Sequence, residues 1–174
     1  MKDVFLIGPK HSGKTSAGKA LALLCARIFI DLDVLVTQRT GKTPRELYNQ
    51  GPEIFRKEEA DALAALVKSG RKERVIALGG GVIDNPRAIS MLEDDAMLVY
   101  LDISADSAWR RIVNSGDLPP FLKTENPKET HCALHERRAA AYRRIARIII
   151  EAERKTCEEI ANEIFSRLSD SEKL

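Results

Sequence analysis

The sequence predicts a three-layer α/β/α fold, in which helices cover both faces of a parallel sheet of about five strands. Two patterns lead to this expectation. Short apolar runs, which we interpret as buried strands, alternate with amphipathic stretches whose apolar residues recur at helical spacing. That alternation is typical of repeated strand and helix units. The five apolar runs are Val4–Ile7, Ile28–Ile30, Val75–Leu78, Met97–Ile103 and Ile148–Ile150.

Cap signals before the amphipathic stretches indicate where the helices begin. Three of them combine a capping side chain with a carboxylate three residues later, which is the capping-box pattern. Proline at the first helical position strengthens several of the signals. In chain order they are Thr43-Pro44 with Glu46, Asn85-Pro86, Asn126-Pro127 with Glu129, and Thr156 with Glu159.

Length and composition favour one domain with a small-molecule partner. A chain of 174 residues is about the size of one domain, so we expect residues 1–174 to share one core. With 28 Lys and Arg against 26 Asp and Glu, no strong field of one sign favours nucleic acid or a membrane surface. The longest apolar run, Ala20–Ala26, is far shorter than the roughly 18 residues of a membrane span. Since Val4–Ile7 is also too short for a signal peptide, we expect a cytoplasmic monomer.

Residues 8–15 have the composition and the position of a phosphate-binding loop. They fit the pattern GxxxxGK[ST] and lie between a predicted strand and a predicted helix, as this loop requires. Its glycines let backbone N–H groups surround an anion, and the next helix directs its positive end at the phosphates. Lys14 would bridge the β- and γ-phosphates of ATP or GTP, and the Thr15 hydroxyl would ligate Mg²⁺. The full set expected to bind the nucleotide is Gly8, Pro9, Lys10, His11, Ser12, Gly13, Lys14, Thr15 and Ser16.

Two carboxylates follow the second predicted strand, at the edge where a parallel sheet binds its ligands. Asp31 would hold waters of the magnesium ion. Asp33 would accept a proton from an acceptor hydroxyl, as a general base in a phosphoryl transfer. The alternative is that the two aspartates only begin the next turn.

Three further features would form an acceptor site. Arg56 and Glu59 lie three residues apart on one predicted helical face, which is also the spacing of a surface ion pair. Gly79–Gly81 follow a strand directly and would let backbone amides approach a ligand, although a flexible turn is the alternative. Arg138 lies on a predicted helix and would close onto a bound anion, unless it belongs to a solvated basic face.

Taken in order, these features resemble the shikimate kinase family. The resemblance runs from about Lys2 to Leu168 and implies a small P-loop kinase, of the nucleoside-monophosphate-kinase type. Such an enzyme transfers the γ-phosphate of ATP to the 3-hydroxyl of shikimate, in the pathway to the aromatic amino acids. The segments that match the family pattern are Gly8–Thr15, Phe29–Asp33, Arg39–Gly41, Phe55–Glu59, Gly79–Gly81, Asn114 to about Leu122, and Arg138–Tyr142.

The resemblance implies a role for each acceptor residue. Arg56 and Arg138 would bind the shikimate carboxylate, and each would contribute roughly 1.5 to 3 kcal/mol as a charge-assisted hydrogen bond. Asp33 would contact the acceptor hydroxyls, Gly79–Gly81 would line the ring, and Glu59 would complete the acceptor set.

The resemblance also concerns arginines near the nucleotide, and one that the family has is missing from this chain. By the resemblance, Arg111 and Arg154 would pack against the adenine. The family also has an arginine in its lid, which we place in the aperiodic stretch from Asn114 to about Asn126, but Leu118-Pro119-Pro120 stand there. A transfer-stabilising arginine is worth roughly 10³ to 10⁵ in rate, and Lys123 is our candidate to replace it.

Two other functions stay open at this point. A related sugar-acid kinase such as gluconate kinase also needs groups that bind a carboxylate and hydroxyls. A nucleotide-binding module with weak or no turnover would follow from the missing lid arginine.

His131 and His135 lie four residues apart on a predicted helix, which is a metal-binding spacing. The sequence HxxxH lacks the glutamate of the zinc-protease motif, so we expect a solvated helix face instead. Trp109 is most simply a packing residue.

Overall fold

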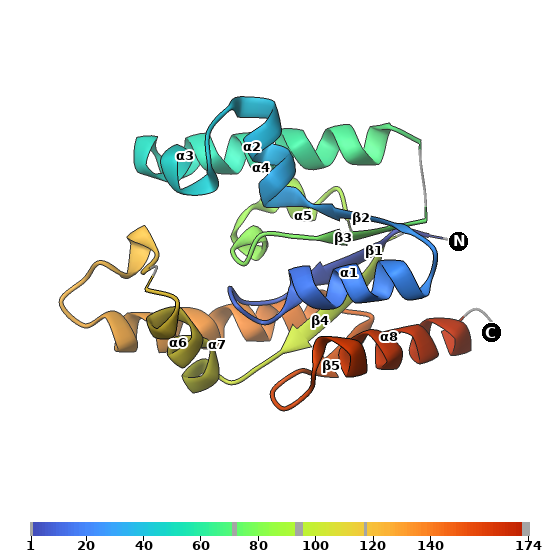
Figure 1. The fold of residues 1–174 in the computed structure, drawn as a ribbon. Coiled ribbons are helices and arrows are strands. Elements are labelled where there is room, and N and C mark those ends of the chain that lie inside the picture. Colours follow the sequence, from blue (N-terminus) through green and yellow to red (C-terminus); the bar gives the residue numbers. More distant parts are fainter. Residues whose placement is uncertain (1, 71–72, 93–95, 117, 172–174) are drawn as a thin grey trace.

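The computed structural model describes residues 2–70, 73–92, 96–116 and 118–171, and it confirms the three-layer α/β/α fold (Figure 1). Parallel strands form a five-stranded sheet in the order β2-β3-β1-β4-β5. Each strand begins and ends within one residue of its predicted apolar run. The strands are β1 (Val4–Ile7), β2 (Ile28–Asp31), β3 (Arg74–Ala77), β4 (Met97–Asp102) and β5 (Ile148–Glu151).

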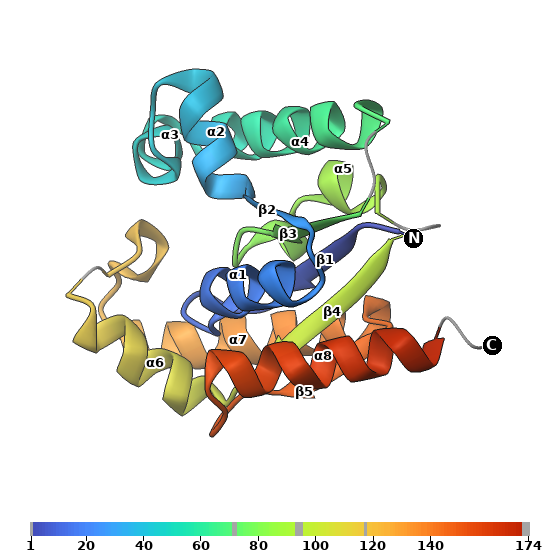
Figure 2. The ribbon, with the colours of Figure 1, turned by 45° about the vertical axis from the view of Figure 1, so that its right-hand side comes forward.

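Helices follow the strands and cover both faces of the sheet. Figure 2 shows α1 and α8 in front of β1, β4 and β5, with α7 behind them. The helices and 3₁₀ turns are α1 (Lys14–Leu24), α2 (Leu32–Thr40), α3 (Pro44–Gln50), α4 (Pro52–Lys68), η1 (Val82–Asp84), α5 (Pro86–Ile89), α6 (Ala105–Asn114), η2 (Pro120–Leu122), α7 (Pro127–Ile145) and α8 (Cys157–Ser171).

The alternation of side chains along each strand divides the core into two parts. In β1, Val4 and Leu6 pack into a cluster with residues of α1 and α8. Phe5 and Ile7 belong to the opposite cluster, which contains residues of α2, α4 and α7. Because the central strands are buried on both faces, their sequences read as continuous apolar runs.

The order of the strands places a ligand-binding crevice beside β1. The chain leaves β1 toward β2 at one edge of the sheet, and it leaves β3 in the opposite direction toward β4. In an open parallel sheet, ligands bind beyond the carboxyl ends of two such neighbouring strands. The phosphate-loop motif follows β1 and the three glycines follow β3, so the topology brings both to this crevice.

Three of the four predicted helix starts are capped as the sequence indicates. Thr43 and Glu46 form a reciprocal capping box, and the Asn85 side chain accepts a hydrogen bond from the Ala88 N–H. At α8, the Thr156 N–H donates to Glu159, and the Glu159 N–H donates to the Thr156 hydroxyl.

The side-chain cap predicted for Asn126 is wrong. The helix α7 does begin at Pro127, but the Asn126 side chain makes no cap hydrogen bond. Instead the Asn126 carbonyl accepts from both the backbone N–H and the hydroxyl of Thr130. Proline at the first position has no N–H and a fixed φ, so the start of this helix does not depend on a capping side chain.

The solvated face predicted for the two histidines is also wrong, because both side chains are buried where α7 packs on α6. The Nε2 atom of His131 lies 3.1 Å from the Ala105 carbonyl, and that of His135 lies 3.0 Å from the Ile103 carbonyl. Trp109 packs on His131, as expected of a packing residue. Burial lowers the pKa of both histidines, which keeps them neutral at physiological pH.

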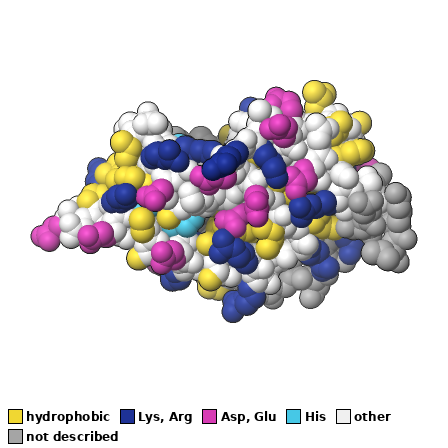
Figure 3. All heavy atoms as spheres, turned by 90° about the horizontal axis from the view of Figure 1, so that it is seen from below, with side chains coloured by type: hydrophobic (Ala, Val, Ile, Leu, Met, Phe, Trp, Pro, Cys, Tyr) yellow, Lys and Arg dark blue, Asp and Glu magenta, His cyan; other side chains and the backbone are white. Residues whose placement is uncertain are grey.

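Charges of both signs mix on the surface seen in Figure 3, with Lys and Arg side chains interspersed among Asp and Glu. This face therefore presents no extended field of one sign. Within the described ranges, every helix is too short or too polar to cross a membrane.

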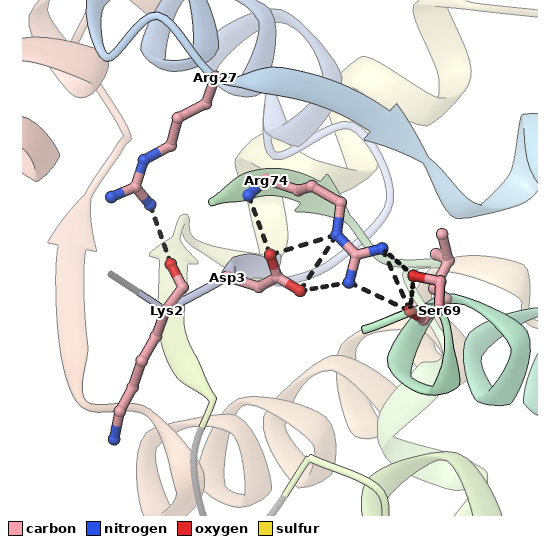
Figure 4. Close-up of polar contacts among 6 residues, drawn as sticks. Lys2, Asp3, Arg27, Ser69 and Arg74 are labelled. Atoms are coloured by element: carbon pink, nitrogen blue, oxygen red, sulfur yellow. Dashed lines mark hydrogen bonds and ion pairs between the residues drawn. The ribbon is translucent and has the colours of Figure 1, made fainter. Parts of the chain in front are cut away.

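A buried ion pair lies at the amino ends of the strands, opposite the crevice (Figure 4). Arg74 of β3 is 4% exposed, and its Nη2 lies 2.5 Å from the Asp3 carboxylate. Its Nη1 donates to the Ser69 hydroxyl at 2.9 Å and to the Leu66 carbonyl at 3.1 Å. These bonds hold the end of α4 against the first residues of β1 and β3.

Replacing Arg74 should destabilise the fold, because Arg74→Leu leaves the Asp3 carboxylate largely buried without its partner. We expect the free energy of unfolding to fall by about 3 kcal/mol, measured by urea denaturation. The double variant Asp3→Asn with Arg74→Leu should recover part of that loss. An Arg74→Leu protein that unfolds at the wild-type urea concentration would contradict the assigned role of the pair.

Candidate active site

The loop of residues 8–13 joins β1 to α1 and lies at the carboxyl end of the sheet. Gly8 has a φ of 144°, and a Cβ added there would lie 2.8 Å from the Leu101 carbonyl oxygen. Only glycine fits a backbone in this conformation and this close to β4. The loop leads directly into α1, whose first N–H groups and positive dipole end face the space in front of it.

Lys14 is the first residue of α1, and its buried side chain turns back onto this loop. Its ammonium group donates to the carbonyl oxygens of Gly8 at 3.0 Å and Pro9 at 2.7 Å. Burial lowers the Lys14 pKa to about 8, while Asp33 and Asp31 act in the opposite direction. The ammonium is therefore held at the loop by carbonyl oxygens, which phosphate oxygens could replace.

Asp31 has two roles, one at the start of a helix and one toward the loop. Its Oδ1 accepts hydrogen bonds from the N–H groups of Asp33 and Val34 and so caps α2. Its Oδ2 accepts from the Thr15 hydroxyl at 2.8 Å. The two sequence interpretations of Asp31 are therefore compatible, because the carboxylate begins the helix and also meets the P-loop hydroxyl. Paired hydroxyl and carboxylate oxygens suit Mg²⁺, which prefers oxygen ligands.

Two cavities meet at the carboxyl edge of the sheet. The first, the P-loop cavity, is about 470 Å³. The second, the arginine pocket, is about 400 Å³. Residues that line both are Lys10, Asp33 and Gly80. The P-loop cavity is lined by Lys10, His11, Gly13, Lys14, Thr15, Ser16, Asp31, Asp33, Leu78, Gly80 and Arg111.

The arginine pocket brings together the acceptor residues that the sequence predicts from four separate segments. Arg56 and Glu59 come from α4, Gly79–Gly81 from the end of β3, Arg138 from α7 and Asp33 from α2. Aromatic side chains form a further part of the lining, the aromatic wall. They are Tyr48, Phe55 and Phe121.

Two of the three arginines that line the pocket, Arg138 and Arg56, are paired with carboxylates of the chain. Arg138 donates from Nε at 2.9 Å and from Nη2 at 2.7 Å to the Asp84 carboxylate. Arg56 donates to Glu53 at 2.6 Å. Burial opposes ionisation of Asp84, but Arg138 and Arg137 outweigh it and lower the pKa of this carboxyl. Sequence reasoning missed Asp84, although its place three residues after the glycines was a usable signal.

Glu59 is a buried carboxyl group rather than a surface ion-pair partner. It is 1% exposed, and its Oε2 accepts from Asn85 Nδ2 at 2.9 Å. Its Oε1 and the Oδ1 of Asp33 have no hydrogen-bond partner among the described residues. Burial raises the pKa of Glu59 to about 7. The pKa of Asp33 is raised as well, first by burial and then by the Asp31 charge.

The three glycines lie in close contact with other parts of the site, and at Gly80 the contact is with backbone, which leaves no room for a side chain. A Cβ on Gly79 would lie 2.7 Å from Glu59 Oε1, and one on Gly80 would lie 2.7 Å from the Lys10 nitrogen. A Cβ on Gly81 would lie 3.1 Å from Arg138 Nη2. The glycines therefore allow the P-loop, α4 and α7 to converge on the end of β3.

The structure brings one of the two predicted adenine arginines to the loop. Arg111 of α6 donates to the His11 carbonyl at 2.8 Å and lines the P-loop cavity. Arg154 is exposed between β5 and α8 and lines neither cavity among the described residues, so its contact with adenine stays a prediction.

The segment predicted as a lid lies over the arginine pocket. It contains η2, and residue 117 lies outside the described residues. The Leu118 carbonyl accepts from Arg45 Nη2 at 2.7 Å, and the Phe121 ring lies 5.5 Å from the Arg138 guanidinium. Lys123 is exposed and lines neither cavity. The structure therefore does not bring Lys123 to the P-loop.

Comparisons with known proteins agree on one family. A family model described as shikimate kinase matches residues 10–169. A shikimate kinase of Caldanaerobacter subterraneus subsp. tengcongensis is 37% identical over 167 residues, which cover 95% of each chain. The solved shikimate kinase of Acinetobacter baumannii in complex with shikimate has a TM-score of 0.88 at 30% identity, and covers 98% of this chain and 94% of its own.

A gluconokinase of Sinorhizobium meliloti has a TM-score of 0.63 at 18% identity, covering 98% of this chain and 94% of its own. That likeness extends to the fold alone. From the family model and the two shikimate kinases together, we conclude that the chain belongs to the shikimate kinase family.

Proposed function

We propose that the chain is an ATP-dependent shikimate kinase, which transfers the γ-phosphate of ATP to the 3-hydroxyl of shikimate. The observation that carries this proposal is the meeting of two cavities at Asp33, one beside a phosphate-binding loop and one that contains Arg56 and Arg138. A triphosphate fits the first, and a small acid with hydroxyl groups fits the second. Family membership supports the same activity.

On the nucleotide side, the loop N–H groups and Lys14 would bind the β- and γ-phosphates of ATP. Arg111 lies beside the loop and would contact the nucleotide. Thr15 and Asp31 would hold Mg²⁺, which neutralises charge on the phosphates when it is bound.

On the acceptor side, Arg138 and Arg56 would exchange Asp84 and Glu53 for the carboxylate of shikimate. The arginines are already placed and charge-paired, so the exchange replaces one carboxylate with another and does not desolvate a bare cation. The aromatic wall would cover the apolar face of the ring.

Asp33 would act as the general base. Its carboxylate would take the proton of the 3-hydroxyl as that oxygen bonds to the γ-phosphorus, while the bond from the γ-phosphorus to the bridging oxygen of ADP breaks. The raised pKa of Asp33 makes its carboxylate a stronger base than an exposed aspartate.

The segment from Asn114 to about Asn126 would serve as the lid that excludes water from this transfer. We also propose that the protein acts as a monomer in the cytoplasm. Support for this comes from the site, because one chain supplies both cavities and the reaction uses ATP.

The assay that tests the function is ADP release by the purified protein with Mg·ATP. We expect release that depends on shikimate and exceeds that with gluconate or with no acceptor. Faster release with gluconate would identify a sugar-acid kinase. ATP binding without any acceptor-dependent release would identify a nucleotide-binding module.

Arg138→Ala should raise the KM for shikimate about 10- to 100-fold, because a charge-assisted bond to the substrate carboxylate is lost. The KM for ATP should change little, as measured in the same assay. Arg137→Ala is a matched control. The neighbouring Arg137 also pairs with Asp84, but its side chain is 60% exposed and lines neither cavity. Equal increases in the KM for shikimate in the two variants would contradict the role of Arg138.

Glu59 should make folding stability depend on pH. Its pKa is about 7 in the folded protein and 4.5 when unperturbed, so between these values the folded state holds a proton that the unfolded chain releases. The stability that Glu59 contributes is thus present below about pH 4.5 and lost as the pH rises to 7.

Glu59→Gln should remove that dependence. The wild-type free energy of unfolding, minus that of the variant, should fall by about 3 kcal/mol between pH 4.5 and 7 in urea titrations. Glu58→Gln, at the neighbouring position where the side chain pairs with Lys57, controls for the change in net charge. A wild-type minus Glu59→Gln difference that stays constant with pH would show that the Glu59 carboxyl is not held protonated.

A further inference from the structure

Lys10 stands at the junction of the spaces around the P-loop. Of the described residues, it alone lines the P-loop cavity, the arginine pocket and a third cavity of about 30 Å³ that lies against α7. Its backbone lies against Gly80, because a Cβ added to Gly80 would be 2.7 Å from the Lys10 nitrogen. The side chain therefore starts from the boundary that a phosphoryl group must cross.

Lys10 lies beside the proposed base at this boundary. Lys10 and Asp33 both line the P-loop cavity and the arginine pocket, so both residues stand where an acceptor hydroxyl would meet the γ-phosphate. Lys14 lines the P-loop cavity but not the arginine pocket, and its ammonium donates to the carbonyls of Gly8 and Pro9.

Among the described residues of the lid, none that lines these cavities carries a charge. Those that line the cavities are Pro119, Pro120 and Phe121, which are uncharged. Lys123 lines none of the three cavities, and Arg45 lines the arginine pocket but not the P-loop cavity. During phosphoryl transfer, negative charge spreads over the equatorial oxygens of the group in transit, and a cation placed there lowers the barrier.

We propose that Lys10 is a further catalytic residue, whose ammonium binds the phosphoryl group in transit between ATP and the acceptor. This inference rests on the proposed kinase activity. The proton of the acceptor hydroxyl goes to Asp33, and Lys10 stays protonated throughout. Lys10 thus supplies, from the P-loop, the positive charge that a lid arginine would otherwise supply.

The test compares Lys10→Met, Lys10→Arg and the matched control Lys123→Met in the shikimate-dependent assay. Lys10→Met should lower kcat about 100- to 1000-fold, with the KM values for ATP and shikimate little changed. Lys10→Arg should recover part of that loss because it keeps the charge. Lys123→Met should behave as the wild type. Equal melting temperatures across the set would show that each variant folds.

A second readout separates catalysis from structure. The complex of ADP, aluminium fluoride and shikimate mimics the transferred group, and Lys10→Met should weaken its binding by a factor like that in kcat while ATP binds as before. A Lys10→Met protein with wild-type kcat would overturn the inference. So would one whose affinity for ATP falls by the same factor as its affinity for the mimic. A wild-type protein without shikimate-dependent ADP release would overturn the proposed function as well, so the two failures are distinguishable.

Discussion

The structure depends on compensation of buried charge at the carboxyl edge of the sheet. Lys14 and Arg138 lie within a few ångströms of oxygens from the chain itself, in carbonyl groups and in the carboxylate of Asp84. An uncompensated charge in such a place would cost several kcal/mol, so these contacts let the site exist before any ligand arrives. Ligand oxygens can then take the places of the chain's own oxygens, and the backbone around Gly80 need not move.

Most of the fold could be predicted because local rules agree with the global arrangement. The strands are found within one residue of their apolar runs, and the central strands β1 and β3 are buried along their whole length. The two wrong predictions concern the burial of a helix face and the cap of a helix, which the local pattern does not determine. His131 and His135 have a spacing that places them on one helix face, but only the packing of α6 makes that face buried. At Asn126, proline at the first helical position lets the helix begin without a capping side chain.

The candidate site was predictable in its residues but not in its electrostatics. The resemblance assigns Arg56, Glu59 and Arg138 to one acceptor site, and the structure brings all three to one pocket. Burial of Glu59 could not be derived from its spacing to Arg56, which suits a surface pair equally well. Asp84 was missed because its partner Arg138 is 54 residues away along the chain. Such pairs follow from topology, which the local sequence pattern does not contain.

The Asp84 and Arg138 pair has a consequence for inhibitor design. A ligand with a carboxylate must displace an internal competitor that is tethered beside the guanidinium at all times. A neutral ligand leaves that pair intact and has to draw its affinity from the aromatic wall of Tyr48, Phe55 and Phe121. The two chemotypes therefore use different side chains of one pocket, which meet where Phe121 lies over Arg138, and a molecule that joins them would gain from both.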